Sequence, residues 1–212
     1  MAQKTLLACG IVAPLLYGVA DVLAGTRLEG YSFRDQTISE LGAIGAASKP
    51  LFSALLFVVY ALVTAFGVGV WKAARGTGRL TISGGLIVGL GVLALTVGQF
   101  ASMRLRGSDQ GLAGTLHLAE GLLAMLMTFS AMGFAAAALG RRFRLYTIAT
   151  IVFALVFGAW SAMDIPRVGS GLATPWVGVK ERLFWYGYQS WFIVLAVAIL
   201  HQVRSGRAKV FP

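Results

Sequence analysis

Six long apolar segments set the strongest limit on how this chain can fold. They cover residues 5–25, 50–73, 80–102, 114–139, 146–165 and 183–203. A helix needs about 20 apolar residues to cross a hydrocarbon core, whereas a membrane barrel would need alternating strands of about 10 residues. The sequence therefore predicts an all-α, polytopic membrane protein, with one domain over residues 1–212 that forms a bundle of six transmembrane helices.

The composition agrees with a membrane protein. Hydrophobic residues make up 58% of the 212 residues and charged residues only 12%, whereas about a quarter of a soluble domain is charged. The net charge of +10 does not indicate nucleic-acid binding, because the basic residues flank the apolar segments. A single cysteine, Cys9, excludes a disulfide framework within the chain. The first apolar segment is longer than that of a signal peptide, so we interpret it as a retained helix.

The charges between the apolar segments predict the orientation of the chain. One side holds ten basic residues and no acidic residue: Lys4, Lys72, Arg75, Arg79, Arg141, Arg142, Arg144, Arg204, Arg207 and Lys209. The other side, with the outer halves of the helices, holds the remaining eight basic residues and all eight acidic residues. Because positively charged loops stay in the cytoplasm, we expect both termini to be cytoplasmic.

The third apolar segment contains a pair of glycines at helical spacing, Gly85 and Gly89. Small residues four apart let two membrane helices approach closely. We expect this pair to serve helix packing within the chain rather than dimerisation.

The stretch YSFRDQTISELGAIG is the longest polar interruption and follows the first apolar segment. Ser32 and Asp35 have the spacing of a helix start, and Gly42 is a suitable stop. Ile38 and Leu41 fall on one helix face, so we expect a short amphipathic helix over the outer end of the bundle. Three polar residues of the stretch would project elsewhere: Arg34, Asp35 and Glu40. The alternative is a solvated loop with one helical turn.

This stretch also resembles a family signature. Its residues are similar to the Tyr…Ile-Ser-Glu-Leu-Gly pattern of bacterial and archaeal six-helix membrane proteins catalogued as domain of unknown function 998. The spacing of the spans, the long first outer loop and a histidine early in the fourth span, His117, are similar too. The resemblance implies a six-helix fold in a prokaryotic cytoplasmic membrane and no particular activity. The matching residues are Tyr31, Ile38, Ser39, Glu40, Leu41 and Gly42.

Ionisable and amide side chains gather at the outer ends of the predicted helices. The candidate catalytic residues are His117, Glu120, Asp164 and Asp21. The candidate ligand-binding residues are Arg34, Glu40, Gln99, Arg104, Arg106, Arg182, Tyr186 and Gln189. Asp21 and Asp164 also allow a simpler interpretation, in which their carboxylates lie in the headgroup region.

Glu120 is the residue that most needs an explanation. It would lie about 9 Å along a helix that begins near Gly114, where an unpaired carboxylate costs on the order of 2.5–3.5 kcal/mol. Its nearest candidate partner is His117, three residues earlier on the same face. Arginines 104, 106 and 182 could also reach it from the rim. A functional role and a structural His–Glu hydrogen bond both remain open.

Motif searches exclude several kinds of site. The sequence has no P-loop, no HExxH and no GxSxG, and it leaves the cofactor unknown. We predict no metal site, because a zinc site needs three protein ligands and the outer side offers one histidine. Five aromatic residues fit an outer aromatic belt rather than ligand stacking: Trp176, Trp185, Tyr186, Tyr188 and Trp191.

Three functions are compatible with these residues. In the first, the protein binds or moves a lipid headgroup or small amphipathic ligand in an outward-facing polar pocket, where arginines meet an anionic group. In the second, it is an intramembrane lipid hydrolase or an acid/base isomerase or cyclase that uses Glu120, Asp164 and His117. In the third, it is a structural or assembly partner. Membrane lipids, with an amphipathic ligand, are the expected partners.

Overall fold

The computed structural model describes residues 2–74, 76 and 78–204. Six helices are long and apolar enough to cross a membrane, so this is a multi-pass membrane protein. The elements in chain order are α1 (Ala2–Gly25), η1 (Ser39–Gly42), α2 (Lys49–Ala73), α3 (Gly78–Leu93), η2 (Ala94–Gly98), α4 (Gly111–Ala138), α5 (Arg141–Ala162), α6 (Ile165–Gly169) and α7 (Val177–Arg204). The predicted class, an all-α bundle of six transmembrane helices, is confirmed.

The helix ends differ from the predicted spans where charged residues continue a helix beyond its apolar part. α5 begins at Arg141 and α7 at Val177, each several residues earlier than its apolar run. Gly140, with a φ of 84°, sets the start of α5, because this conformation suits glycine. The third span is also not one continuous α-helix, since its last five residues form the π-helix η2.

Helices α1, α2, α3 and α4 pack against one another in chain order, and α7 packs against both α1 and α5. Glycines allow the closest contact, between α2 and α3. A Cβ atom added to Gly84 would lie 2.6 Å from the backbone nitrogen of Trp71, and one added to Gly67 would lie 2.6 Å from that of Val88. Gly85 faces open space, whereas Gly89 faces Met127 of α4. The expected packing through small residues of the third span is therefore present, but within this span it is Gly84 that comes closest to the backbone of another helix.

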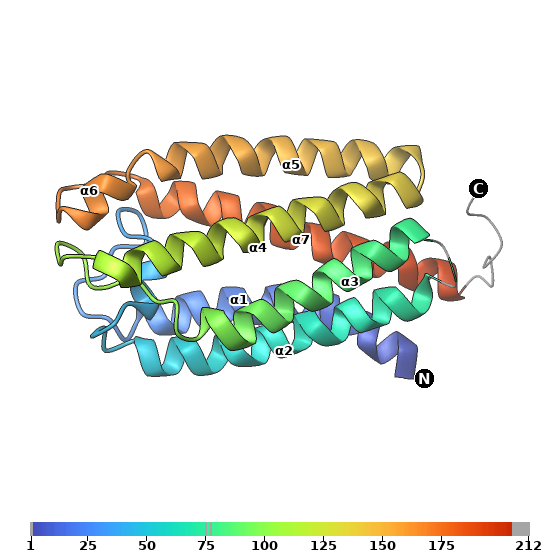
Figure 1. Ribbon diagram of the computed structural model, residues 1–212, viewed down its shortest axis with the longest axis horizontal. Helices are drawn as coiled ribbons and strands as arrows, with labels where there is room; N and C mark the ends of the chain where they lie inside the picture. The colour runs from blue at the N-terminus through green and yellow to red at the C-terminus, as the bar shows by residue number, and fades with distance from the viewer. Residues whose placement is uncertain (1, 75, 77, 205–212) are drawn as a thin grey trace.

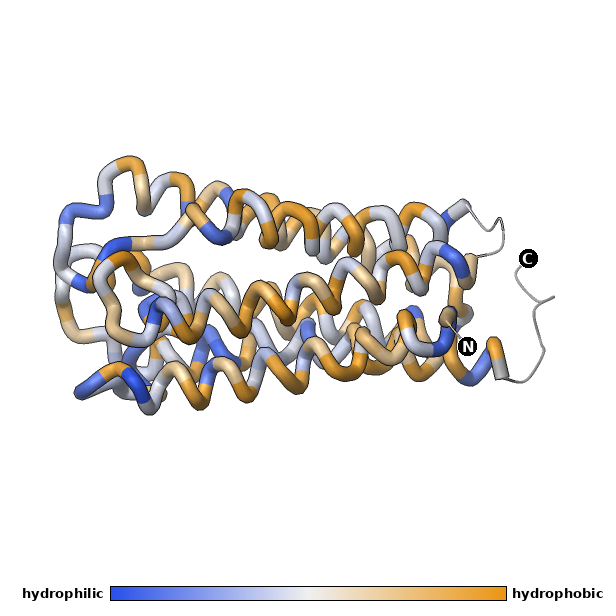
Figure 2. Tube along the Cα trace, turned by 90° about the horizontal axis from the view of Figure 1, so that it is seen from below, coloured by the Kyte–Doolittle hydropathy of each residue, from blue (hydrophilic) through white to orange (hydrophobic). Residues whose placement is uncertain are grey.

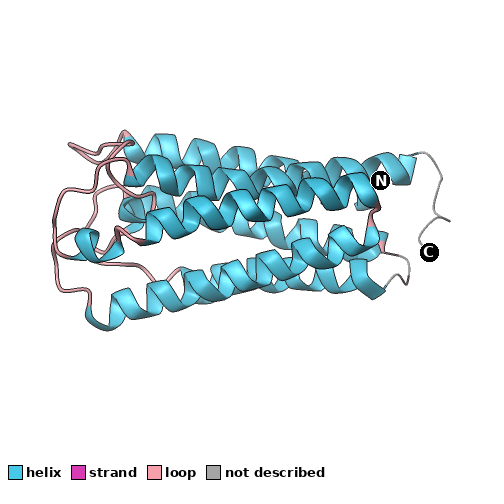
Figure 3. Cartoon of the chain, turned by 90° about the horizontal axis from the view of Figure 1, so that it is seen from above, coloured by secondary structure: helices cyan, strands magenta, loops and turns pink. Residues whose placement is uncertain are grey.

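The two ends of the bundle differ in length and polarity of their connections. α1 starts and α7 finishes at the end where short connections join α2 to α3 and α4 to α5 (Figures 1 and 3). The opposite end carries residues 26–48, 99–110 and 163–176, and we call it the loop end. Hydrophilic segments lie mainly at the two ends, while the middle of the helices is largely apolar (Figure 2).

The polar stretch of the first loop folds as two short turns rather than as one amphipathic helix. One turn follows Ser32, whose backbone carbonyl accepts a hydrogen bond from the Gln36 amide, and the other is the four-residue 3-10 helix η1. Ile38 and Leu41 are buried, as expected for an inward face. Glu40 was expected to project away, but it is only 3% exposed. The stretch is thus neither a surface helix nor a solvated loop.

Candidate functional site

A cavity of about 620 Å³ lies inside the bundle toward the loop end. Its wall includes residues from α1, α2, η2, α4, α5, α6 and α7, together with Thr37 to Ser39 of the first loop. α4 packs mainly against α3 and α5, not against α1, α2 or α7. The face of α4 that lines the space carries small residues, Gly114, Gly121 and Ala124. This absence of side-chain volume leaves the cavity open.

Glu120 lies in the wall of the cavity. A Cβ atom added to Gly98 would lie 3.3 Å from its Oε1 atom, so the carboxylate lies beside the π-helix η2. Glu120 forms no hydrogen bond or ion pair with any other residue that the structure describes. π-helical turns are rare and are frequent at functional sites. Glu120 is therefore a half-buried carboxylate in the cavity wall, next to a π-helical turn and without a partner among the described residues.

His117 also lines the cavity, but it does not pair with Glu120. Its Nδ1 atom lies 2.9 Å from the backbone oxygen of Ala101. Because a carbonyl oxygen only accepts, Nδ1 carries the proton and Nε2 of the neutral ring is left as an acceptor. The His117–Glu120 hydrogen bond, one of the two interpretations that the sequence left open, is therefore absent, and the imidazole bonds to the Ala101 carbonyl of the loop after η2 instead.

A first polar network ties α1 to α7 and to the first loop, and we call it the Asp21 network. Arg182 donates from Nε and Nη2 to the two carboxylate oxygens of Asp21, at 2.8 and 2.7 Å. The Tyr186 hydroxyl donates to the same carboxylate, and Arg182 donates to the Tyr31 hydroxyl at 2.8 Å. Asp21 is only 1% exposed. The carboxylate is buried but fully paired, so its role is to hold these elements together.

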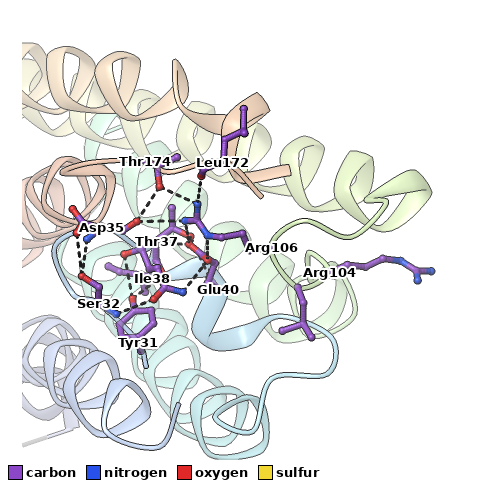
Figure 4. A network of polar contacts seen from close by, with 12 residues as sticks. Tyr31, Ser32, Asp35, Thr37, Ile38, Glu40, Arg104, Arg106, Leu172 and Thr174 are labelled. Carbon is purple, nitrogen blue, oxygen red and sulfur yellow. Dashed lines mark hydrogen bonds and ion pairs between the residues drawn. The ribbon is translucent and has the colours of Figure 1, made fainter. Parts of the chain in front are cut away.

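A second network, the Glu40 network, joins three loops (Figure 4). Arg106 donates to both oxygens of Glu40 at 2.8 Å and to the Leu172 carbonyl and the Thr174 hydroxyl at 3.0 Å. Glu40 also accepts from the backbone amide of Thr37 at 2.7 Å. Burial would raise the pKa of Glu40, but the bonds from Arg106 and Thr37 outweigh it and lower the pKa.

Two further carboxylates at the start of α7 and the end of α5 also have partners. Asp164 forms an ion pair with Lys180, whose Nζ atom lies 5.2 Å from the centre of the Trp160 ring. Glu181 lines the cavity and accepts hydrogen bonds from the Ile38 amide and the Ser39 hydroxyl. Neither carboxylate resembles Glu120, because both have donors from the protein.

The candidate ligand-binding residues do not converge on one point. Arg106, Arg182, Glu40 and Tyr186 belong to the two networks. Arg34 pairs with the neighbouring Asp35 and lies over Trp176. The exposed side chain of Arg104 extends away from the Glu40 network (Figure 4). Gln99 lines the cavity, whereas Gln189 is buried elsewhere. No described arginine lines the cavity.

Several cavity residues were not predicted as site residues. Trp185 and Tyr188 were assigned to an aromatic belt, but they line the cavity, and the Trp185 ring stacks on Tyr17 at 5.9 Å. Tyr60 and Gly98 also line it and lie within apolar runs that gave no signal. Among the residues that the structure describes, no group of three or more His, Cys, Asp or Glu side chains could hold a metal ion.

Comparison with known proteins identifies a family and adds no individual relative. No curated protein and no solved structure matches the chain. A family model described as "Protein of unknown function (DUF998)" matches residues 11–198. This match covers most of the chain: it begins within α1, ends within α7 and includes the four membrane-spanning helices between them. The chain therefore belongs to this family of proteins of unknown function.

Proposed function

We propose that the protein binds a lipid or another small amphipathic molecule in the cavity. The observation that carries this proposal is a volume of about 620 Å³ with a mainly apolar wall and a carboxylate that has no partner among the described residues. Ligand pockets usually have volumes of roughly 300–1,000 Å³ and combine apolar walls with a few polar groups that orient the ligand. Glu120 and the free Nε2 atom of His117 would supply those polar groups.

We further propose that the loop end faces outward and that both termini are cytoplasmic, in the cytoplasmic membrane of a prokaryote. Several basic residues of the opposite end support this orientation: Lys4, Lys72, Arg79, Arg141, Arg142 and Arg144. Arg75, Arg207 and Lys209 of the same predicted set lie outside the described residues. The four ion pairs among the described residues all lie at the loop end, where acids balance the basic charge.

An enzyme that acts on the bound molecule is the second candidate, and Glu120 and His117 would be its acid/base residues. Both line the cavity, and a carboxylate and an imidazole can transfer protons without a cofactor. Asp21 and Asp164 do not favour this role, because each is bound to a cationic side chain. Binding is the simpler proposal, since both functions require it.

Filling the cavity tests the proposal. Gly121 lies on the lining face of α4, between Leu118 and Met125, and an added Cβ atom would meet nothing within 4 Å. We expect Gly121→Leu to remove lipid or other amphipathic molecules that copurify with the protein, measured by mass spectrometry of extracts. The matched control is Gly133→Leu, at an exposed glycine of the same helix that also has free space. Equal amounts of bound molecules in both variants would refute binding in the cavity.

A further inference from the structure

We infer that the cavity selects amphipathic molecules with a positively charged head, such as an alkylammonium, over anionic ones. This inference rests on the proposed function and specifies the chemical class of its ligand. The described lining residues include two carboxylates, Glu120 and Glu181, and no lysine or arginine. The sequence alone favoured an anionic headgroup held by arginines, so the ligand that we infer has the opposite charge.

The nearby basic side chains are already bound to the protein. Arg106 and Arg182 bind the carboxylates of the two networks, and Lys180 binds Asp164. The Lys49 ammonium donates to the Gly42 carbonyl at 3.0 Å and to the Ser102 hydroxyl at 2.5 Å. Recruiting any of these cations to an anionic ligand would require breaking bonds that hold the loops.

The two carboxylates of the wall are not equivalent. Glu181 accepts hydrogen bonds from the Ile38 amide and the Ser39 hydroxyl, so the first loop already stabilises its charge. Glu120 has no such donor within the described chain. An ionised group within a membrane helix is costly unless it is paired or wetted. An ammonium group in the cavity would pair with Glu120, whereas a second anion would repel it.

Aromatic rings complete a site for a cation. The wall includes the rings of Tyr17, Phe52, Tyr60, Phe184, Trp185 and Tyr188. Tyr60 and Tyr188 line the same cavity as Glu120. Ring faces attract cations within about 6 Å, most strongly where water is excluded. A cavity wall that carries both a carboxylate and aromatic rings therefore favours an ammonium head, and the remaining apolar wall suits an alkyl chain.

Three probes with the same chain length test the charge preference: decylammonium, decanol and decanoate. Binding would be measured at pH 7.5 by equilibrium dialysis of the full-length protein in dodecyl maltoside, against empty micelles. We expect the wild-type protein to bind decylammonium at least about tenfold more tightly than decanol, and decanoate most weakly. Glu120→Gln should reduce decylammonium binding to the level of decanol. Glu29→Gln, the same change at an exposed position of the loop end, should leave the preference intact.

The outcomes separate this inference from the proposed function. Equal binding of the three probes, or tightest binding of decanoate, would overturn the charge preference. The proposed function would survive that result if Gly121→Leu still lowered binding of the probes. Binding no greater than to empty micelles for all three probes would overturn the inference and count against the proposed cavity function as well. An unchanged preference in Glu120→Gln would exclude Glu120 as the group that recognises the charge.

Discussion

The carboxylates of the two polar networks, Asp21 and Glu40, which we call the rim carboxylates, differ from the cavity carboxylate Glu120 in what surrounds them. Asp21 and Glu40 are 1% and 3% exposed, and each is bound by one arginine through two hydrogen bonds. Glu120 is half-buried beside an unfilled space and has no partner in the described chain. A buried charge is tolerated when its partners come with the fold. The difference indicates that the rim carboxylates stabilise the structure, while Glu120 is available to a ligand.

Arg182→Ala should have the largest effect on stability, because it leaves Asp21 charged, buried and without its main partner. Removing one member of a buried pair costs about 3–5 kcal/mol. We expect a large fall in the thermal unfolding temperature of the purified protein in detergent, followed by tryptophan fluorescence. Arg104→Ala is the matched control, since this side chain is exposed and lies outside both networks.

An Arg182→Ala protein as stable as Arg104→Ala would contradict a structural role for the rim. If ligand retention fell while stability was unchanged, Arg182 would instead belong to the binding site. This second outcome is the role that the sequence suggested for the arginine.

Glu40→Gln should have a smaller effect, and this effect should depend on pH. Replacing the carboxylate weakens its hydrogen bonds with Arg106 and Thr37, each worth about 1.5–3 kcal/mol when one partner is charged. The pKa of Glu40 is lowered in the folded protein. The ionised carboxylate therefore contributes its full stability above the ordinary pKa of 4.5, and this contribution is lost as the pH falls through the folded pKa.

Thermal unfolding of the wild-type and Glu40→Gln proteins between pH 7 and pH 3 measures this difference. The gap between the two unfolding temperatures should be widest at neutral pH and should close in acid. A constant gap over the whole range would show that the charge of Glu40 contributes nothing.

The sequence predicted the six spans because each is an apolar run of membrane-spanning length, and hydropathy depends only on local residues. It also predicted that the acids gather at one end. It could not predict which acids are paired, because Asp21 and Arg182 are 161 residues apart and meet only through the packing of α1 against α7. In the sequence, Asp21 and Glu120 look alike, since each is an acidic residue near the outer end of an apolar segment, although their surroundings in the structure differ.

The sequence suggested a polar pocket at the outer end, but it could not predict the mainly apolar lining of the cavity, for a related reason. It exists because small residues on α4 leave volume unfilled and because η2 brings Gly98 beside Glu120. Neither property changes the hydropathy of a span. Glycines in membrane helices usually indicate close packing, and Gly84 follows that rule while Gly121 does not. Only the positions of the neighbouring helices distinguish the two cases.

Glu120→Leu should leave stability unchanged or raise it, on the order of 1 kcal/mol, in protein freed of bound molecules. The substitution removes, from a largely apolar wall, a carboxylate that has no partner in the described part of the chain. The gain should be smaller than the full insertion cost of a carboxylate, because Glu120 is only half-buried. The measurement is the thermal unfolding of the Glu120→Leu protein. The control is the Glu29→Leu protein, which carries the same change at an exposed position. A clear loss of stability would mean that Glu120 is a structural group like Asp21, and the contrast between rim and cavity would disappear.

The smallest expected effect is the coupling between His117 and Glu120. Because His117 bonds to the Ala101 carbonyl and not to Glu120, the stability changes of His117→Leu and Glu120→Leu should add in the double variant. Neighbouring residues that share a hydrogen bond or a cavity couple by about 0.5–3 kcal/mol. Since His117 and Glu120 share the cavity but no bond, we expect a coupling energy at the low end of this range, near about 0.5 kcal/mol. A double-mutant cycle on thermal unfolding measures it. Strong coupling would indicate a structural His–Glu pair, because Glu120 would then have its partner within the protein. It would favour the third candidate function, a structural or assembly partner that binds no ligand.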